Sequence, residues 1–301
     1  MLRYLILIVV FLFQFNLVFS QGSQSLQSSQ SSQGVEFDYF SVVDWSKGEM
    51  FINVDTVFAP GSGTVRIRDN SEDVFKENFF KIFMDSIKKD KYGQIYFNSS
   101  STVEEKINST PNILSYIDDI YNNIIKVFSL LSRDSSGMNM QYKLDIYKNI
   151  GNYFITHEQA IKPEKTILWT PSDKYTGIVI YADASYPVHG ENSVSRLKPA
   201  IYPSVYDEKM RKVLSMEMVK PQYLVQWGSA GYFSDPKDPG IKERVGDKPL
   251  YTTARKLYGR YGSDIIIPSA DADRIFYKGQ NENIIMEGRF VIINTLPSDK
   301  P

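Results

Sequence analysis

Hydrophobic and polar positions at the start of the chain follow a strand pattern. Residues 36–57 mix aromatic and β-branched residues around a turn signal at Lys47-Gly48. This pattern predicts a hairpin with one strand at Phe40–Val43 and another at Met50–Val57. A second, shorter strand is predicted at 92–97, between the two helices described next.

Helical spacing replaces the strand pattern after the hairpin. Apolar residues recur every three or four positions from an N-cap at Ser71 to Ile87, and again from Pro111 to Ser135-Ser136-Gly137. Two helices are therefore predicted. The stripe of the second consists of Ile113, Ile117, Ile120, Ile124, Phe128 and Leu131. It is too short for a coiled coil, which favours packing within the domain over a helix that binds a partner.

The pattern changes again near residue 163, where short apolar runs alternate with Gly and Pro turns. A short turn or helix is predicted from Ser269 to Ile275. The predicted strands are 175–183, 200–202, 223–227, 249–260, 264–268 and 289–294. Because helices precede a run of strands, we expect an α+β fold. Its parts would be a hairpin-and-helix module at 35–162 and a strand-rich mixed-sheet module at 163–301.

The N-terminus predicts export. Arg3 is followed by an unbroken apolar run at Leu5–Phe13, and Val18-Phe19-Ser20 fits a cleavage site, so residues 1–20 are predicted to be a signal peptide. The alternative is an uncleaved membrane anchor, which polar residues shortly after the run disfavour. Residues 21–34 hold five Gln and six Ser and predict a flexible tether. No transmembrane segment is expected after cleavage.

Composition narrows the function classes. The 34 basic residues nearly balance the 35 acidic ones, and nothing indicates a nucleic-acid partner. The chain has no cysteine, which excludes disulfides, thiol catalysis, zinc–thiolate sites and a lipid on cysteine. A cysteine-free exported domain of this length is more typical of a bacterial envelope than of a eukaryotic secretory pathway. The 20 Tyr and 18 Phe favour a β-rich core with aromatic faces over an adhesive surface.

Candidate chemistry is sparse, since the chain has two histidines and neither a G-x-S-x-G nor an HExxH motif. The sequence predicts no catalytic residue with a recognisable motif, no metal and no cofactor. The alternative is a periplasmic hydrolase or small-ligand-binding protein whose site uses Asp183, His189 and Glu191. Asp271 and Asp273 fit helix capping better than calcium binding, because an apolar residue stands where the next oxygen ligand belongs.

An ordered set of motifs occupies about residues 165–295. It consists of Thr176–Asp183, Arg196–Pro203, Tyr206–Glu208, Arg244–Leu250, Ser263–Ile267 and Ala270–Ile275. This set resembles a family of exported proteins and lipoproteins of spirochaetes and other Gram-negative bacteria, some of them similar to flagellar-assembly and outer-membrane lipoproteins. Many members carry a lipid-bearing cysteine, which this chain lacks. The resemblance implies an envelope role linked to motility rather than a reaction.

Several residues in these motifs are expected to have structural or interaction roles. Gly177 and Gly246 are expected where the chain turns at strand edges, and Pro199 at the edge of an extended segment. Asp207 and Asp271 are expected as caps, paired with Arg196 and Arg244, although these arginines suit an anion as well. The sequence thus predicts a non-catalytic periplasmic or envelope-associated protein. It would be an assembly or structural component linked to the flagellum or outer membrane, with other envelope or flagellar proteins as partners.

Overall fold

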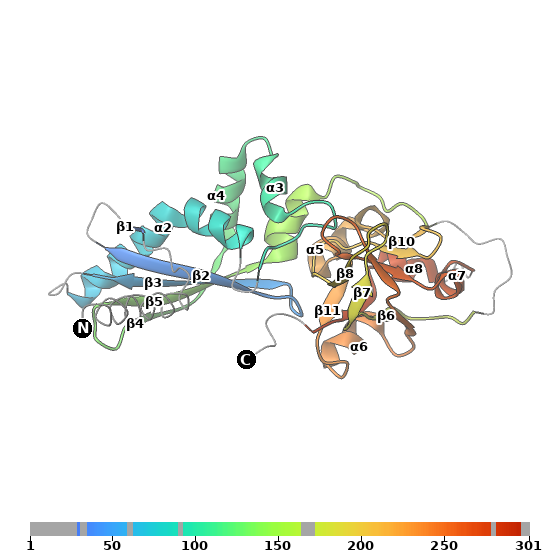
Figure 1. Cartoon of the computed structure of the whole chain (residues 1–301). Helices are drawn as coiled ribbons and strands as arrows, with labels where there is room; N and C mark the ends of the chain where they lie inside the picture. Colours follow the sequence, from blue (N-terminus) through green and yellow to red (C-terminus); the bar gives the residue numbers. More distant parts are fainter. Residues whose placement is uncertain are drawn as a thin grey trace, which may run out of the picture.

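The computed structural model of the chain describes residues 29–30, 35–58, 63–89, 93–163, 172–277 and 281–295 (Figure 1). The predicted signal peptide lies outside these residues, as does the predicted tether except for Ser29–Gln30. Within the described ranges, no helix has the length and apolar character needed to cross a membrane. The predicted α+β class is confirmed, since a hairpin and helices are followed by a strand-rich module.

In the described part of the first module, the strands form one antiparallel sheet with the order β1-β2-β3-β5-β4. Its strands are β1 (Ser29–Gln30), β2 (Glu36–Asp44), β3 (Glu49–Val57), β4 (Ile125–Leu131) and β5 (Gly137–Asp145). The predicted hairpin forms β2 and β3, closed by a turn in which Gly48 has φ 67. Part of the predicted tether is a strand, because Ser29–Gln30 pairs with the start of β2.

Helix α2 (Thr64–Lys88) covers the buried face of this sheet (Figure 1). Phe75 stacks on Tyr142 of β5 with ring centroids 3.7 Å apart. The prediction of an N-cap at Ser71 is wrong. Ser71 lies inside the helix, where its hydroxyl donates to the Ile67 carbonyl at 2.7 Å. The run of charged and polar residues around Ser71 hid the first turns of this helix from the hydrophobic pattern.

The second predicted helix is half helix and half strand. Helix α4 (Ile113–Asn123) ends where Ile124 adopts extended backbone with φ −71 and ψ 140. Ile125–Leu131 then forms β4, which pairs antiparallel with β5. The prediction of one helix through Leu131 is therefore wrong. A short apolar run fits either period, and pairing with β5 selects the strand.

Within its described residues, the second module holds three sheets. One is parallel with the order β11-β15-β6-β12, one is mixed with the order β10-β9-β14-β13, and β7 and β8 form a hairpin. Strands β6, β14 and β15 confirm predicted strands, and their nearly continuous burial agrees with the apolar runs. The bounds are β6 (Ile178–Tyr181), β7 (Ser185–Pro187), β8 (Val194–Arg196), β9 (Val205–Asp207), β10 (Lys212–Leu214), β11 (Gly231–Phe233), β12 (Leu250–Thr253), β13 (Lys256–Tyr258), β14 (Asp264–Ile267) and β15 (Phe290–Ile293).

Short helices connect these strands. They are η3 (Met216–Met218), α5 (Pro221–Trp227), α6 (Pro239–Val245), α7 (Ser269–Tyr277) and α8 (Glu282–Met286). The strand predicted at 223–227 is wrong, because Pro221 starts a helix there and Gly228, with φ 76, ends it. The strand predicted at 249–260 is divided. Its first half, β12, joins the parallel sheet, and its second half, β13, joins the mixed sheet.

The two modules share one hydrophobic core at a closely packed junction. Strand β5 continues into η1 (Ile146–Ile150) and η2 (Gly151–Phe154), which contact α5. The Tyr147 ring lies between Gly48 and Gly228, where an added Cβ would come within 2.3 Å of the ring from either side. The strands predicted at 92–97 and 200–202 are reduced to isolated bridges, in which Tyr96 pairs in parallel with Ala200 and antiparallel with Thr102. Residue 92 lies outside the described residues.

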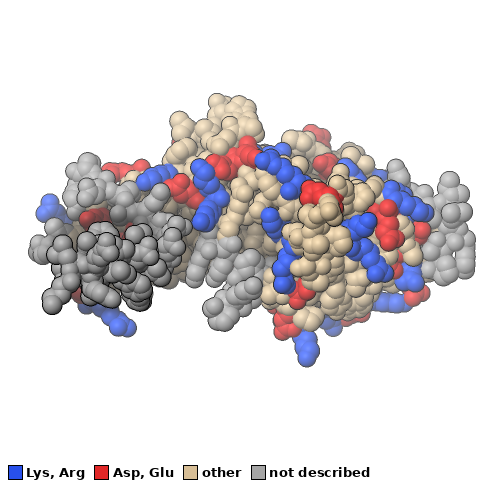
Figure 2. Space-filling model, viewed as in Figure 1, with Lys and Arg blue, Asp and Glu red and all other residues tan. Residues whose placement is uncertain are grey.

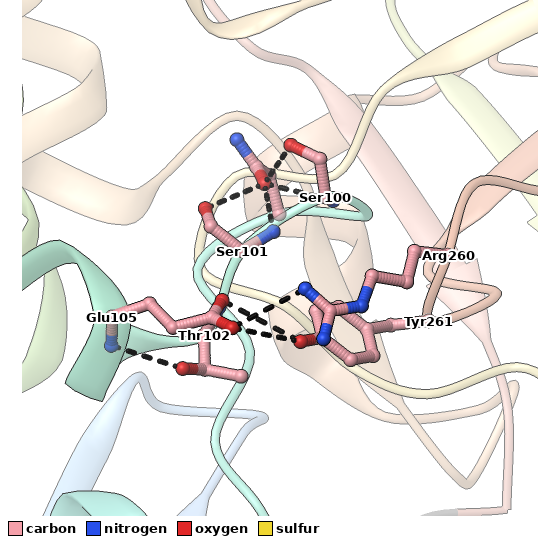
Figure 3. Close-up of polar contacts among 7 residues, drawn as sticks. Ser100, Ser101, Thr102, Glu105, Arg260 and Tyr261 are labelled. Atoms are coloured by element: carbon pink, nitrogen blue, oxygen red, sulfur yellow. Dashed lines mark hydrogen bonds and ion pairs between the residues drawn. The ribbon is translucent and has the colours of Figure 1, made fainter.

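A polar cluster at the start of helix α3 (Val103–Asn108) also joins the modules (Figure 3). Thr102 and Glu105 form a capping box, in which each side chain bonds to the backbone of the other. The Glu105 carboxylate also accepts hydrogen bonds at 3.3 Å from Arg260 and from Tyr261 of the second module. One carboxylate thus caps the helix and holds the loop after β13.

Candidate functional site

Asp183, the first residue of the predicted catalytic alternative, lies beyond the carboxyl end of β6. Its carboxylate accepts hydrogen bonds from the hydroxyl and the amide of Thr295, the amide at 2.9 Å, and pairs with Arg196 at 3.1 Å. These contacts, the Thr295 hydroxyl first, hold the pKa of Asp183 below its usual range. Asp183 is therefore a fixed anion that ties β6 to the end of β15, which does not suit a proton donor.

The other two residues of that alternative contact different neighbours. The His189 ring packs near Tyr258 with centroids 5.9 Å apart, and its amide donates to the Leu257 carbonyl. Glu191 accepts a hydrogen bond from Ser193 at 2.8 Å. Over the part of the chain that the structure describes, no three His, Asp or Glu residues are grouped so that they could hold a metal ion. The described geometry brings together no catalytic group around His189.

Asp207 caps a turn, but its partner differs from the predicted ones. The buried carboxylate accepts from the amides of Lys209 at 2.9 Å and Arg211 at 2.8 Å, and pairs with the Arg211 guanidinium at 2.6 Å. The same guanidinium reaches Asp273 of α7 at 2.7 Å. The predicted pairing of Asp207 with Arg196 or Arg244 is therefore wrong, because Arg211 is close in sequence and occupies the carboxylate.

Asp271 lies in the first turn of α7, but no described backbone amide donates to its carboxylate, so the predicted cap does not form. Its side chain accepts a hydrogen bond from Thr252 at 2.7 Å and pairs with Arg274 at 3.2 Å. The predicted pairing with Arg196 is wrong, since the β7–β8 hairpin places Arg196 beside Asp183 instead.

Arg244 is buried in α6, and among the described residues no carboxylate lies within ion-pair distance of it. Its guanidinium donates to the carbonyls of Trp227 at 2.6 Å, Gly228 at 2.9 Å and Gly288 at 3.0 Å. The predicted carboxylate partner is therefore wrong, and backbone carbonyls at the end of α5 take its place. Burial lowers the pKa of Arg244 to about 10, so the side chain stays charged at neutral pH.

The remaining residues singled out from the sequence serve close packing. Gly246 ends α6 with φ 74, a backbone conformation that favours glycine. A Cβ on Gly177, just before β6, would lie 2.4 Å from the Cβ of Val245, so the end of α6 packs directly on the backbone there. Pro199 is buried beside the Tyr96–Ala200 bridge. The roles of these residues are therefore in backbone geometry and close packing.

Strand β4 carries apolar side chains that packing among the described residues does not cover. It ends the order of its sheet, so one row of its backbone N–H and C=O groups has no described strand beside it. Five large apolar side chains on it are exposed: Ile125 by 58%, Val127 by 47%, Phe128 by 38%, Leu130 by 59% and Leu131 by 40%. We call these five residues the apolar edge.

Edge strands are usually protected by charges, proline, a bulge or a covering element. In β4 the register shifts between Lys126 and Phe128, but the strand holds no proline and, among the described elements, no further strand pairs with it. The charged residue of β4 is Lys126, and its ammonium pairs with Glu72 of α2 at 2.6 Å. A row across the sheet continues the surface from Phe128 through Gln141 and Asn53 to Phe40, which is 40% exposed. This row lies on the face opposite α2, because it alternates with the buried positions.

Such a strand can accept another extended segment. The outer row of backbone groups, which no described strand pairs, provides hydrogen bonds, and the apolar side chains provide contact area. Together these are the basis of recognition by strand addition. Sequence reasoning missed this site because it assigned Ile125–Leu131 to a helix. The usable signal was a run rich in β-branched and aromatic residues that ends at the turn-forming segment at 132–137.

Two protein-family models match the chain. That of the N-terminal domain of Treponema pallidum Tp0624 matches residues 36–153, and that of the second domain of the same protein matches residues 177–295. Together they cover well over half of the chain, in the same order. No curated protein matches. The matches confirm the part of the predicted resemblance that concerns spirochaetes.

Proposed function

We propose that the chain, which belongs to the family of Treponema pallidum Tp0624, is a non-catalytic exported protein of the cell envelope that assembles with another protein through β4. The observation that carries the proposal is the apolar edge, because an exported protein with five exposed apolar side chains on an open edge strand is at risk of aggregation unless a partner covers it. Export itself rests on the N-terminal sequence pattern.

Charge gives no competing interaction site on the visible face. Figure 2 shows Lys and Arg interspersed with Asp and Glu over the described part of this face, without a broad patch of one sign. This distribution agrees with the near balance of 34 basic and 35 acidic residues. Apolar contact and backbone hydrogen bonding at β4 are the interactions on which we base assembly. The envelope and flagellar components implied by the sequence resemblance are the partners that we propose.

The test replaces Ile125 and Leu130 together by lysine. We expect binding to the partner to weaken at least ten-fold, because two charges would have to be desolvated at the edge. The fold should persist, since each side chain is more than half exposed, by 58% and 59%. The matched control replaces Leu114 and Val194 by lysine, since these apolar residues are exposed by 67% and 68% elsewhere. The affinities of both double variants for the cross-linked partner are then compared with that of the unaltered protein.

Capture of a protein from an extract does not support the proposal alone. A photo-activatable residue at Leu130 must cross-link an extended segment of the same partner, and a residue at Leu114 must not. Equal partner affinity in the edge variant and the control variant contradicts the proposal. The hydrolase alternative is tested separately by His189→Ala with Glu191→Gln. An unchanged envelope phenotype with intact folding counts against it.

A further inference from the structure

A polar pocket at the junction of the modules is independent of β4. It has a volume of about 190 Å³, and it is lined by the loop at 97–100 of the first module and by residues of the second module between 202 and 217. Asp264, at the start of β14, completes the wall. The volume is several times the roughly 30 Å³ share of one water molecule and below the ~300 Å³ typical of sites for drug-sized ligands. The pocket therefore suits a small molecule.

Asp264 supplies a negative group inside this pocket. The residue is 2% exposed, and its carboxylate accepts hydrogen bonds from the Ser99 hydroxyl at 2.6 Å and from the Ser204 amide at 2.8 Å. Within the described ranges, no lysine or arginine lies within 4 Å of this carboxylate. Buried carboxylates are normally paired with a cation. Asp264 is thus a buried anion whose countercharge the described chain does not supply at contact distance.

Lys212 supplies a positive group at the exposed side of the same pocket. It is an exposed residue at the start of β10, and it also has no ion-pair partner within 4 Å among the described carboxylates. Its charge acts at longer range on Asp264 and on Glu217, a third charged residue of the lining. The pocket therefore has a negative interior and a positive rim.

We propose that this pocket binds a small zwitterion of the free amino acid class, with its ammonium group against Asp264 and its carboxylate against Lys212. A ligand of this class supplies the missing countercharge to each residue through charge-assisted hydrogen bonds. Glu217 lines the same pocket. Because both modules line the pocket, the bound molecule contacts both and stabilises their junction.

The test is calorimetric titration of the purified protein with a panel of free amino acids. For the tightest binder, we expect at least ten-fold weaker binding of the analogue in which an amide replaces the carboxylate. The same loss is expected for the analogue that lacks the amino group. Asp264→Asn and Lys212→Met should each weaken binding of the amino acid at least ten-fold. Lys209→Met, an exposed lysine on the neighbouring turn, is the matched control and should bind as the unaltered protein does.

Circular dichroism and thermal unfolding confirm that each variant is folded before it is titrated. Three outcomes overturn the proposal. One is that no amino acid of the panel binds, another is that both pocket variants bind as tightly as the Lys209 control, and the third is that uncharged polyols bind while amino acids do not.

Discussion

Replacing Arg244 by methionine is expected to lower the free energy of unfolding by about 3 kcal/mol or more, among the largest effects of a single side chain in the second module. The buried guanidinium donates to three carbonyls, of Trp227, Gly228 and Gly288. Methionine fills much of the same volume and donates to none of them. Each buried carbonyl left without a donor costs about 1–3 kcal/mol, partly offset by the cost of burying a charge.

The position of these carbonyls explains why the cation is tolerated without a carboxylate. Trp227 and Gly228 lie at the C-terminal end of α5, where the backbone carries partial negative charge, and the guanidinium also lies 5.2 Å from the Trp227 ring centroid. Arg244→Lys keeps the charge but loses the planar arrangement of donors, so we expect an intermediate loss. Arg244 therefore joins α6, α5 and the segment before β15.

Urea unfolding of the two variants measures this effect. Arg255→Met is the control, since its exposed side chain forms no hydrogen bond or ion pair with a described residue, and it should change stability by less than about 0.5 kcal/mol. If Arg244→Met unfolds at the same urea concentration as Arg255→Met, the three carbonyl contacts contribute little to stability.

The local sequence pattern predicted those parts of the fold in which the apolar residues follow either the helix period or the strand period clearly. The alternating apolar positions of β2 and β3 and the continuous apolar runs of β6, β14 and β15 admit one interpretation each. Residues 124–131 admit two interpretations, because a short apolar run without long alternation fits a helix face and a strand equally well. The partner strand β5 decides the outcome, and a sequence read alone does not show which strand is adjacent.

The candidate sites were harder to predict than the elements, because distant segments form them. Asp264 was assigned only to a strand, and its partner Ser99 lies 165 residues earlier in the chain. Arg244 was matched with carboxylates because exposed charges usually pair with opposite charges. Its actual partners are backbone carbonyls, which every residue has and which no sequence pattern distinguishes. Contacts of this kind follow from the packing of the two modules.

Asp264→Asn is expected to stabilise the protein at neutral pH, by an amount that depends on pH. Burial raises the pKa of Asp264 to about 6, although hydrogen bonds from Ser99 and Ser204 and the charge of Lys212 oppose the rise. The unfolded-state pKa is about 3.9. Between these values the folded protein binds the proton more tightly than the unfolded chain does. The stabilising contribution is therefore complete below about pH 4 and is lost as the pH rises through 6.

The size of this loss follows from the difference between the two pKa values, at about 1.4 kcal/mol for each unit, and is about 3 kcal/mol at most. The asparagine variant carries no titrating group there. Its carbonyl can accept from the Ser204 amide, and its amide can donate to the Ser99 hydroxyl. The variant should thus be close to the unaltered protein in stability at pH 4 and should exceed it progressively up to pH 7.5.

Urea unfolding of both proteins at intervals from pH 4 to pH 8 gives the difference between their free energies of unfolding. Titrating groups that the two proteins share contribute equally to both and cancel in this difference. Asp119→Asn is the matched control, because that residue is exposed and its side chain bonds to no described residue, so its difference should stay flat with pH. A flat curve for Asp264→Asn would show that the carboxylate is solvated in the junction. The uncompensated burial of this charge, from which zwitterion binding is argued, would then be lost as an explanation, whereas assembly through β4 would be unaffected.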